Sequence, residues 1–122
     1  MYLDDPRIIR KLQYRFKHDA IIYGIRCQVT NMLYVGSTLS SSLRFHKHLI
    51  TGEQSNANLQ AAIVKYGLGM FTVHIFKVVS IPMGATYNVE KDILLAYEKE
   101  YILAVPSQRL YNTNKYMADR AN

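Results

Sequence analysis

Two short runs rich in β-branched and aromatic residues lie close together near the start of the chain, at residues 21–26 (IIYGIR) and 33–36 (LYVG). A polar turn around residues 28–31 separates them, and this pattern predicts a hairpin. Each run carries one tyrosine, Tyr23 and Tyr34. Because side chains alternate between the two faces of a strand, pairing of the runs can bring both hydroxyls to one face. A serine-rich stretch then leads into a helix that carries Arg44, and two phenols beside a guanidinium indicate a site for a phosphate group.

Apolar periodicity and capping residues predict five further elements. Helical spacing of apolar side chains predicts amphipathic helices, and the run FTVHIFKVV predicts a third strand. Asp5 before Pro6, Asn58, Asn88 and the closing Gly67 are typical of helix ends. The expected helices are 6–17, 41–51, 58–67 and 89–104, and the strand is 71–79. This α-β-β-α-α-β-α order predicts one small α/β domain, in which helices flank a three-stranded mixed or antiparallel sheet.

Positive charge is concentrated in the first part of the chain. Residues 1–77 carry ten basic and four acidic side chains, which accounts for the whole net charge of +6. A one-sided basic half is the electrostatic footprint of a nucleic-acid binder. One face of the expected N-terminal helix is basic, and it either follows a phosphate backbone or is simply solvated; its residues are Arg7, Arg10, Lys11, Arg15 and Lys17.

Cysteine usage and hydropathy exclude several protein classes. The single cysteine, Cys27, excludes an internal disulfide and a cysteine metal site, and it fits a reducing compartment. No run approaches the roughly 18 apolar residues of a membrane span, and the first residues do not resemble a signal peptide. We therefore expect a soluble protein with no membrane partner. His46 and His48 do not indicate zinc, because residues i and i+2 of a helix face different ways.

The tyrosine pair, with Gly36 and Arg44 after it, resembles the motif of the GIY-YIG nuclease family. The first triplet corresponds to Ile21-Ile22-Tyr23, where Ile21 replaces the family's first glycine but the functional tyrosine is kept. The second triplet corresponds to Tyr34-Val35-Gly36. The resemblance covers residues 21–112, about three-quarters of the chain, and is greatest to the catalytic domains of homing endonucleases encoded in introns of organelles and phages. The downstream matches are Arg44, His48, the helix NLQAAIVKYG, Glu98 in YEKEYI, and Asn112 after Tyr111.

This resemblance implies hydrolysis of phosphodiester bonds with one divalent ion, Mg²⁺ or Mn²⁺. Glu98 would supply a hard oxygen ligand to that ion, and Arg44 would help to neutralise charge on the scissile phosphate. Tyr23 is the candidate for activating water. A phenol is a poor base at neutral pH, so Tyr34 or His48 would relay the proton, and Tyr34 is also placed to orient water or phosphate.

The remaining candidate residues have supporting roles. Asn112 is expected to tie the tail to the core, although it counts among the candidate catalytic residues. Ser37, directly after the second triplet, is a candidate phosphate contact. The expected contacts to double-stranded DNA also include Arg7, Arg10, Lys11, Arg15 and Lys47.

The resemblance divides the chain into a basic N-terminal helix (1–19), a nuclease domain (20–112) and a C-terminal tail (113–122). No obligate protein partner is implied; a transient dimer, or a DNA-binding region outside this chain, is left open. An organelle-encoded enzyme would act in the mitochondrion, and otherwise a cytoplasmic location is expected. Two alternatives remain: a repair or restriction nuclease with the same fold, and a nucleic-acid-binding module that does not cut. Retention of the motif residues argues against the second.

Overall fold

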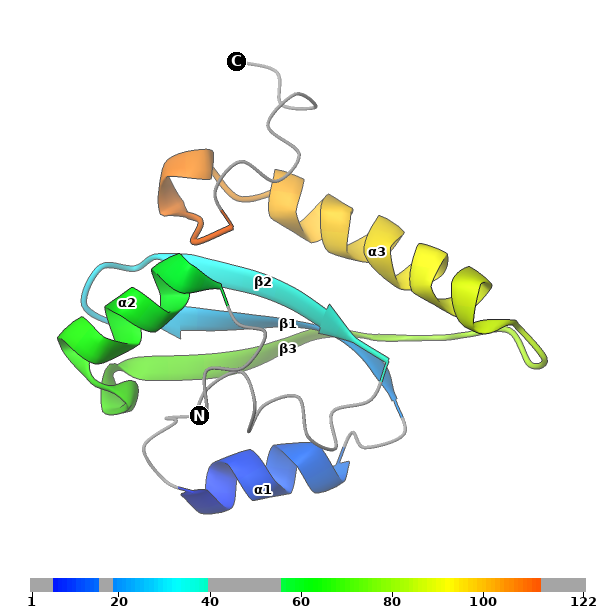
Figure 1. Ribbon diagram of the computed structural model, residues 1–122, viewed down its shortest axis with the longest axis horizontal. Coiled ribbons are helices and arrows are strands. Elements are labelled where there is room, and N and C mark those ends of the chain that lie inside the picture. The colour runs from blue at the N-terminus through cyan, green and yellow to red at the C-terminus, as the bar shows by residue number, and fades with distance from the viewer. Residues whose placement is uncertain (1–5, 16–18, 40–55, 113–122) are drawn as a thin grey trace.

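Three antiparallel strands form the sheet of this protein, in the order β2-β1-β3 (Figure 1). The computed structural model describes residues 6–15, 19–39 and 56–112. The strands are β1 (Ala20–Cys27), β2 (Leu33–Thr38) and β3 (Phe71–Val79), and the helices are α1 (Pro6–Arg15), α2 (Ala57–Tyr66) and α3 (Tyr87–Leu103). Two short 3₁₀ turns, η2 (Leu68–Met70) and η3 (Ser107–Arg109), complete the elements. The predicted α/β domain with an extra N-terminal helix is confirmed, and its sheet is antiparallel.

Alternation along the strands divides the core into two layers. Ile21, Tyr23 and Ile25 of β1 face α2, where they pack with Leu59 and other buried side chains. Ile22 faces the other way, into a second apolar cluster that contains side chains of α3. The two helices therefore cover opposite faces of the sheet, which we call the α2 face and the α3 face.

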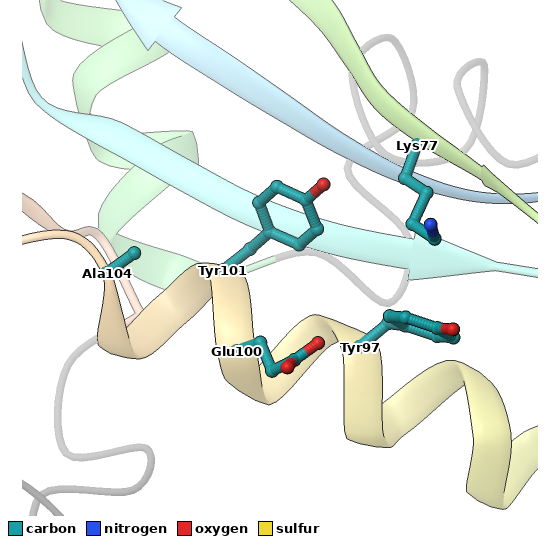
Figure 2. A pocket seen from close by; sticks show the side chains of 5 residues that line it. All are labelled: Lys77, Tyr97, Glu100, Tyr101 and Ala104. Carbon is teal, nitrogen blue, oxygen red and sulfur yellow. The ribbon is translucent and has the colours of Figure 1, made fainter.

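Aromatic side chains fix α3 on its face of the sheet. The ring of Phe76 in β3 stacks on Tyr101 of α3, with ring centroids 5.4 Å apart and an interplanar angle of 8°. Next to this pair, the Lys77 ammonium lies 4.8 Å from the centroid of the Tyr97 ring (Figure 2). Gly24 of β1 makes room for the Phe76 ring, because a Cβ there would lie 2.5 Å from Phe76 Cζ. Side-chain contacts with β3 thus hold α3 on this face, and its backbone also lies close to β2 and β1.

A short C-terminal segment covers the outer edge of β2. Leu33 and Leu110 form a parallel bridge, and the Tyr111 N–H donates to the Leu33 carbonyl oxygen at 2.9 Å. The amide of Asn58 in α2 also donates to the Tyr111 carbonyl oxygen, at 3.4 Å. The bond between Tyr111 and Leu33 pairs a backbone group that the edge strand otherwise leaves open, and the bond from Asn58 ties the segment to α2.

Several predicted element boundaries were wrong by two residues. Asn56, not Asn58, caps α2, because its side chain accepts the Leu59 N–H at 3.0 Å. Thr86, not Asn88, caps α3 in the same way, by accepting the Val89 N–H at 3.4 Å. The predicted closing glycine of α2 is confirmed, since the Gly67 N–H donates to the Ile63 carbonyl oxygen. The predicted helix 41–51 lies outside the described residues, and within them no helix is long and apolar enough to span a membrane.

Candidate active site

Tyr23 and Tyr34 lie together on the α2 face of the sheet. In the β1–β2 register Tyr34 is opposite Ile25, and Tyr23 is opposite Gly36, so alternation puts both tyrosines on one face. The two ring centroids are 6.4 Å apart with an interplanar angle of 45°. Tyr23 is fully buried and Tyr34 is half-buried. A buried phenol beside a more accessible one is suited to holding a water or a phosphate oxygen at the rim of the core.

Gly36 makes this arrangement possible. A Cβ at Gly36 would lie 2.6 Å from Cζ and 2.7 Å from Oη of Tyr23, and 2.8 Å from Cε1 of Tyr34. The Tyr23 ring therefore lies across the bare backbone of Gly36, in space that any other residue would fill. Gly36 is a positioning residue. Its place in the second triplet was recognised in the sequence, but its contact with the Tyr23 ring was not predicted.

Asn112 clips the C-terminal segment to the middle of β2. The Val35 N–H donates to Asn112 Oδ1 at 2.9 Å, and Asn112 Nδ2 donates to the Val35 carbonyl oxygen at 2.8 Å. The amide thus pairs with Val35 as a neighbouring peptide group would, and Asn112 is buried. Val35 stands between Tyr34 and Gly36, so this clip fixes the backbone that carries the tyrosine site. Both polar atoms of the Asn112 amide are used in the clip.

Glu98 approaches the sheet from the other side. It is 4% exposed and lies on the stripe of α3 that also buries Leu94 and Ile102, both of which belong to the core of the α3 face. The structure therefore places α3 on the face of the sheet opposite α2, and α3 contacts β2, the strand that carries Tyr34 and Gly36. No local pattern in the sequence indicates which face α3 covers.

A single buried carboxylate fits the type of metal site that the family resemblance implies. Mg²⁺ usually keeps several waters and is held by one or two carboxylates together with substrate phosphates. Glu98 offers a hard oxygen donor of this kind. Among the described residues, no group of three His, Cys, Asp or Glu side chains is placed to hold an ion. The residues present thus fit an ion that shares its ligands with the substrate better than one held in an all-protein cage.

Ser37 points away from the tyrosine pair. It follows Gly36 in β2 and is opposite Ile22, a residue of the α3-face core. Ser37 lines an open pocket between the end of β2 and α3, together with Tyr87 and Lys91. A phosphate held by Ser37 is therefore a different phosphate from one held by the tyrosines.

The remaining predicted site residues fall into two groups. Arg44, Lys47 and His48 lie outside the described residues. The four predicted basic contacts in the N-terminal helix are all exposed on α1, and they form one stripe around Tyr14, which is 75% exposed; they are Arg7, Arg10, Lys11 and Arg15. Figure 1 shows α1 on the side of the molecule opposite α3.

A polar cluster at the β1–β2 turn was not predicted. Burial raises the pKa of the Cys27 thiol, but hydrogen bonds with the Thr30 hydroxyl, with the backbone at Thr30 and Val29, and with the Tyr111 hydroxyl outweigh burial and hold that pKa below its usual range. Burial also raises the pKa of the Tyr111 phenol, against a hydrogen bond with Thr30. The cluster joins the turn to the C-terminal segment that carries Asn112. It therefore helps to hold that segment, and with it the Asn112–Val35 hydrogen bonds, in place.

Two solved structures resemble this chain in fold and in sequence. One is a point mutant of the catalytic domain of the intron endonuclease I-TevI, with a TM-score of 0.60 and 26% identity over 77% of this chain and 92% of that one. The other is the catalytic domain of the homing endonuclease I-TevI, with a TM-score of 0.59 and 29% identity over 79% of this chain and 99% of that one. No protein-family model and no curated protein sequence matches the chain. The structural matches confirm the predicted resemblance to GIY-YIG homing endonucleases.

Proposed function

We propose that this chain, a GIY-YIG endonuclease by its fold and its likeness to the I-TevI catalytic domain, hydrolyses phosphodiester bonds of double-stranded DNA with the help of one divalent ion. The ion is Mg²⁺ or Mn²⁺. We further propose that it is the catalytic domain of an intron-encoded homing enzyme, because both structural relatives are such domains.

The observation that carries the proposal is the tyrosine pair packed against Gly36. Tyr23 lies in a fixed position, since its ring is fully buried and rests on bare backbone. A fixed phenol beside a half-buried one is a preorganised site for a water and a phosphate oxygen, and such preorganisation contributes much of the rate enhancement of enzymes. Ordinary core packing does not need two tyrosines to converge on one glycine at the edge strand.

Each residue then has a role that follows from its chemistry. Tyr23 orients the attacking water and accepts its proton as it passes its own hydroxyl proton on, either through Tyr34 to solvent or, where Tyr34 instead holds a phosphate oxygen, to the His48 imidazole. Arg44 neutralises charge on the scissile phosphate, and His48 is the second candidate for the relay; both are proposed from the sequence motif alone. Glu98 would hold the divalent ion, whose contribution when bound is to neutralise charge on the phosphate and on the leaving oxygen. Asn112 keeps β2 in place.

DNA is the substrate class that the charge distribution supports. The stripe on α1 contains four basic side chains and no acidic one, so it attracts a phosphate backbone without regard to sequence. We propose that it adds nonspecific affinity to a domain whose target recognition comes from elsewhere.

A nicking assay tests the proposal directly. Purified protein is incubated with supercoiled plasmid in Mg²⁺ and in EDTA, and the variants Tyr23→Phe and Glu98→Gln are compared with Glu100→Gln as the matched control. Glu100 lies on the same helix as Glu98 but is exposed. We expect nicking only with the ion, near-normal nicking by Glu100→Gln, and a loss of two or more orders of magnitude in the other two.

Circular dichroism and thermal melts establish that each variant is folded before its activity is compared. Nicking that persists in EDTA would remove the metal from the proposal. Equal nicking by Glu98→Gln and the wild type, or no nicking by the wild type in any divalent ion, would overturn it.

A further inference from the structure

An open pocket of about 350 Å³ lies where β2 ends beside α3. Its polar lining consists of Ser37, Thr38, Tyr87 and Lys91, and Leu94 contributes apolar surface. We call it the β2–α3 pocket. None of the described residues that line it carries a carboxylate.

The pocket is next to the candidate active site, but on the other side of the sheet. Along β2, Ser37 directly follows Gly36, and the Tyr23 ring packs against the backbone of Gly36. Along α3, Lys91 precedes Glu98 by seven residues, which is two helical turns or about 10 Å at 1.5 Å per residue. Residues 91, 94 and 98 follow one helical stripe, along which Leu94 and Glu98 are buried and Lys91 is exposed at the pocket. The pocket and the proposed metal ligand therefore share one side of β2.

The lining chemistry selects an anion. The hydroxyl groups of Ser37 and Tyr87 supply hydrogen-bond donors, and the Lys91 ammonium supplies a positive charge with three more. A phosphodiester matches this set, since its charged oxygens accept from hydroxyls and ammonium groups, while the apolar wall suits the adjoining deoxyribose. Lys91 and Glu98 are about 10 Å apart along the axis of α3. This spacing corresponds to roughly three phosphates of one DNA strand, at about 3.4 Å of DNA helix axis each.

We propose that the β2–α3 pocket binds a phosphodiester of the DNA strand that is cut, within about three nucleotides of the scissile bond. Ser37 and Tyr87 donate hydrogen bonds to its oxygens, and Lys91 neutralises its charge. This inference rests on the proposed nuclease function and specifies how the substrate lies: the strand passes from the tyrosines on the α2 face around β2 to Lys91 on the α3 face. The pocket contributes to binding and register and takes no part in the chemical step.

The test separates binding from chemistry with Lys91→Gln and Ser37→Ala. The matched control is Lys65→Gln, because Lys65 is exposed on α2, where its ammonium lies 5.2 Å from the centroid of the Tyr66 ring and away from the pocket. The equilibrium affinity for a random-sequence duplex is measured in EDTA over a range of salt concentrations. Nicking of supercoiled plasmid in Mg²⁺ then gives kcat and KM.

For Lys91→Gln we expect KM and the dissociation constant to rise roughly tenfold, as for the loss of one hydrogen-bonded charge, with kcat within twofold of the wild type. The slope of log affinity against log salt should become shallower by about 0.9, the value for one phosphate contact. Ser37→Ala should weaken binding less and leave the salt slope unchanged, and Lys65→Gln should match the wild type.

An unchanged affinity and salt slope in Lys91→Gln would overturn the inference, and so would an equal effect in Lys65→Gln. A fall in kcat at unchanged KM would also overturn it, because it would place Lys91 in the chemistry. Binding in EDTA does not require cleavage. A protein that binds DNA as expected but never nicks it would therefore refute the nuclease function. The affinities measured in EDTA would still show whether the β2–α3 pocket contacts a phosphate.

Discussion

Replacement of Gly36 by alanine tests how the site is built. The added methyl group would lie 2.6 Å from Cζ and 2.7 Å from Oη of Tyr23. Carbon atoms in contact prefer about 3.5–4.0 Å, so the ring and the strand must separate by about 1 Å. The Tyr23 ring is fully buried in the α2-face core, and it cannot move that far without displacing its neighbours.

Two effects of different size follow from this displacement. Overpacking of a closed core costs about 1–3 kcal/mol of unfolding free energy. A shift of about 1 Å in a catalytic group can cost about a hundredfold in rate, equivalent to about 2.7 kcal/mol in the activation barrier. Gly36→Ala should therefore remain folded at moderate temperature, with a lower urea midpoint and about one per cent of the wild-type kcat in plasmid nicking.

Gly24→Ala is the matched control. Its added Cβ would lie 2.5 Å from Cζ and 2.6 Å from Cε2 of Phe76, on the α3 face and away from the tyrosines. A similar overpacking cost of about 1–3 kcal/mol is expected, with kcat within a few-fold of the wild type. If both glycine variants, shown to be folded, nick DNA equally well, then the contact between Gly36 and Tyr23 does not position the catalytic group and the reasoning is refuted.

Three further predictions concern the clip, the basic helix and alkaline pH. Asn112→Ala removes both partners of Val35 and should lower the urea-derived unfolding free energy by roughly 2–3 kcal/mol; a loss below half a kcal/mol would contradict the clip. Removal of residues 1–17 should weaken DNA binding and flatten its salt dependence, whereas an unchanged slope would leave α1 a purely structural element. Tyr111 has a raised pKa in the folded state, so its stabilising contribution is present below the unfolded value of about 10 and is lost as pH rises through the folded value. Urea midpoints across alkaline pH should fall less in Tyr111→Phe than in the wild type.

Local sequence patterns predicted the strands well because sheet residues have local signatures. The run FTVHIFKVV became β3 with the predicted bounds, Phe71–Val79, and the two tyrosines share a face because alternation is a property of any strand. Helix starts were harder to place. Two residues able to cap occur two positions apart in each case, Asn56 with Asn58 and Thr86 with Asn88. In both, the earlier residue caps, which gives the helix additional residues, and Asn58 is used instead to bind the Tyr111 carbonyl oxygen.

The layering of the helices could not be predicted from such patterns. Nothing local to residues 89–104 tells which face of the sheet α3 covers, so the sequence could not place the helix that carries Glu98 relative to the tyrosine pair. The same holds for Ser37, whose direction follows from alternation but whose neighbours Tyr87 and Lys91 come from a distant helix. Likewise, the contact between Gly36 and Tyr23 depends on the exact register of β1 with β2, which a motif does not encode.

The lack of further carboxylates grouped with Glu98 among the described residues has a consequence for the order of binding. An ion held by Glu98 would find few protein ligands among the described residues, so water and phosphate oxygens of DNA would have to complete its coordination. The affinity for the ion must then be higher on the DNA complex than on the free protein. Because such coupling is reciprocal, the ion must strengthen DNA binding by the same factor. Calorimetric titration of Mg²⁺ into Tyr23→Phe, with and without duplex, should therefore show tight ion binding only with DNA present. Equal affinity in both titrations would mean that protein groups alone bind the ion. That result would contradict the reasoning, because Glu98 is a single carboxylate and would need further carboxylate ligands to bind the ion without DNA.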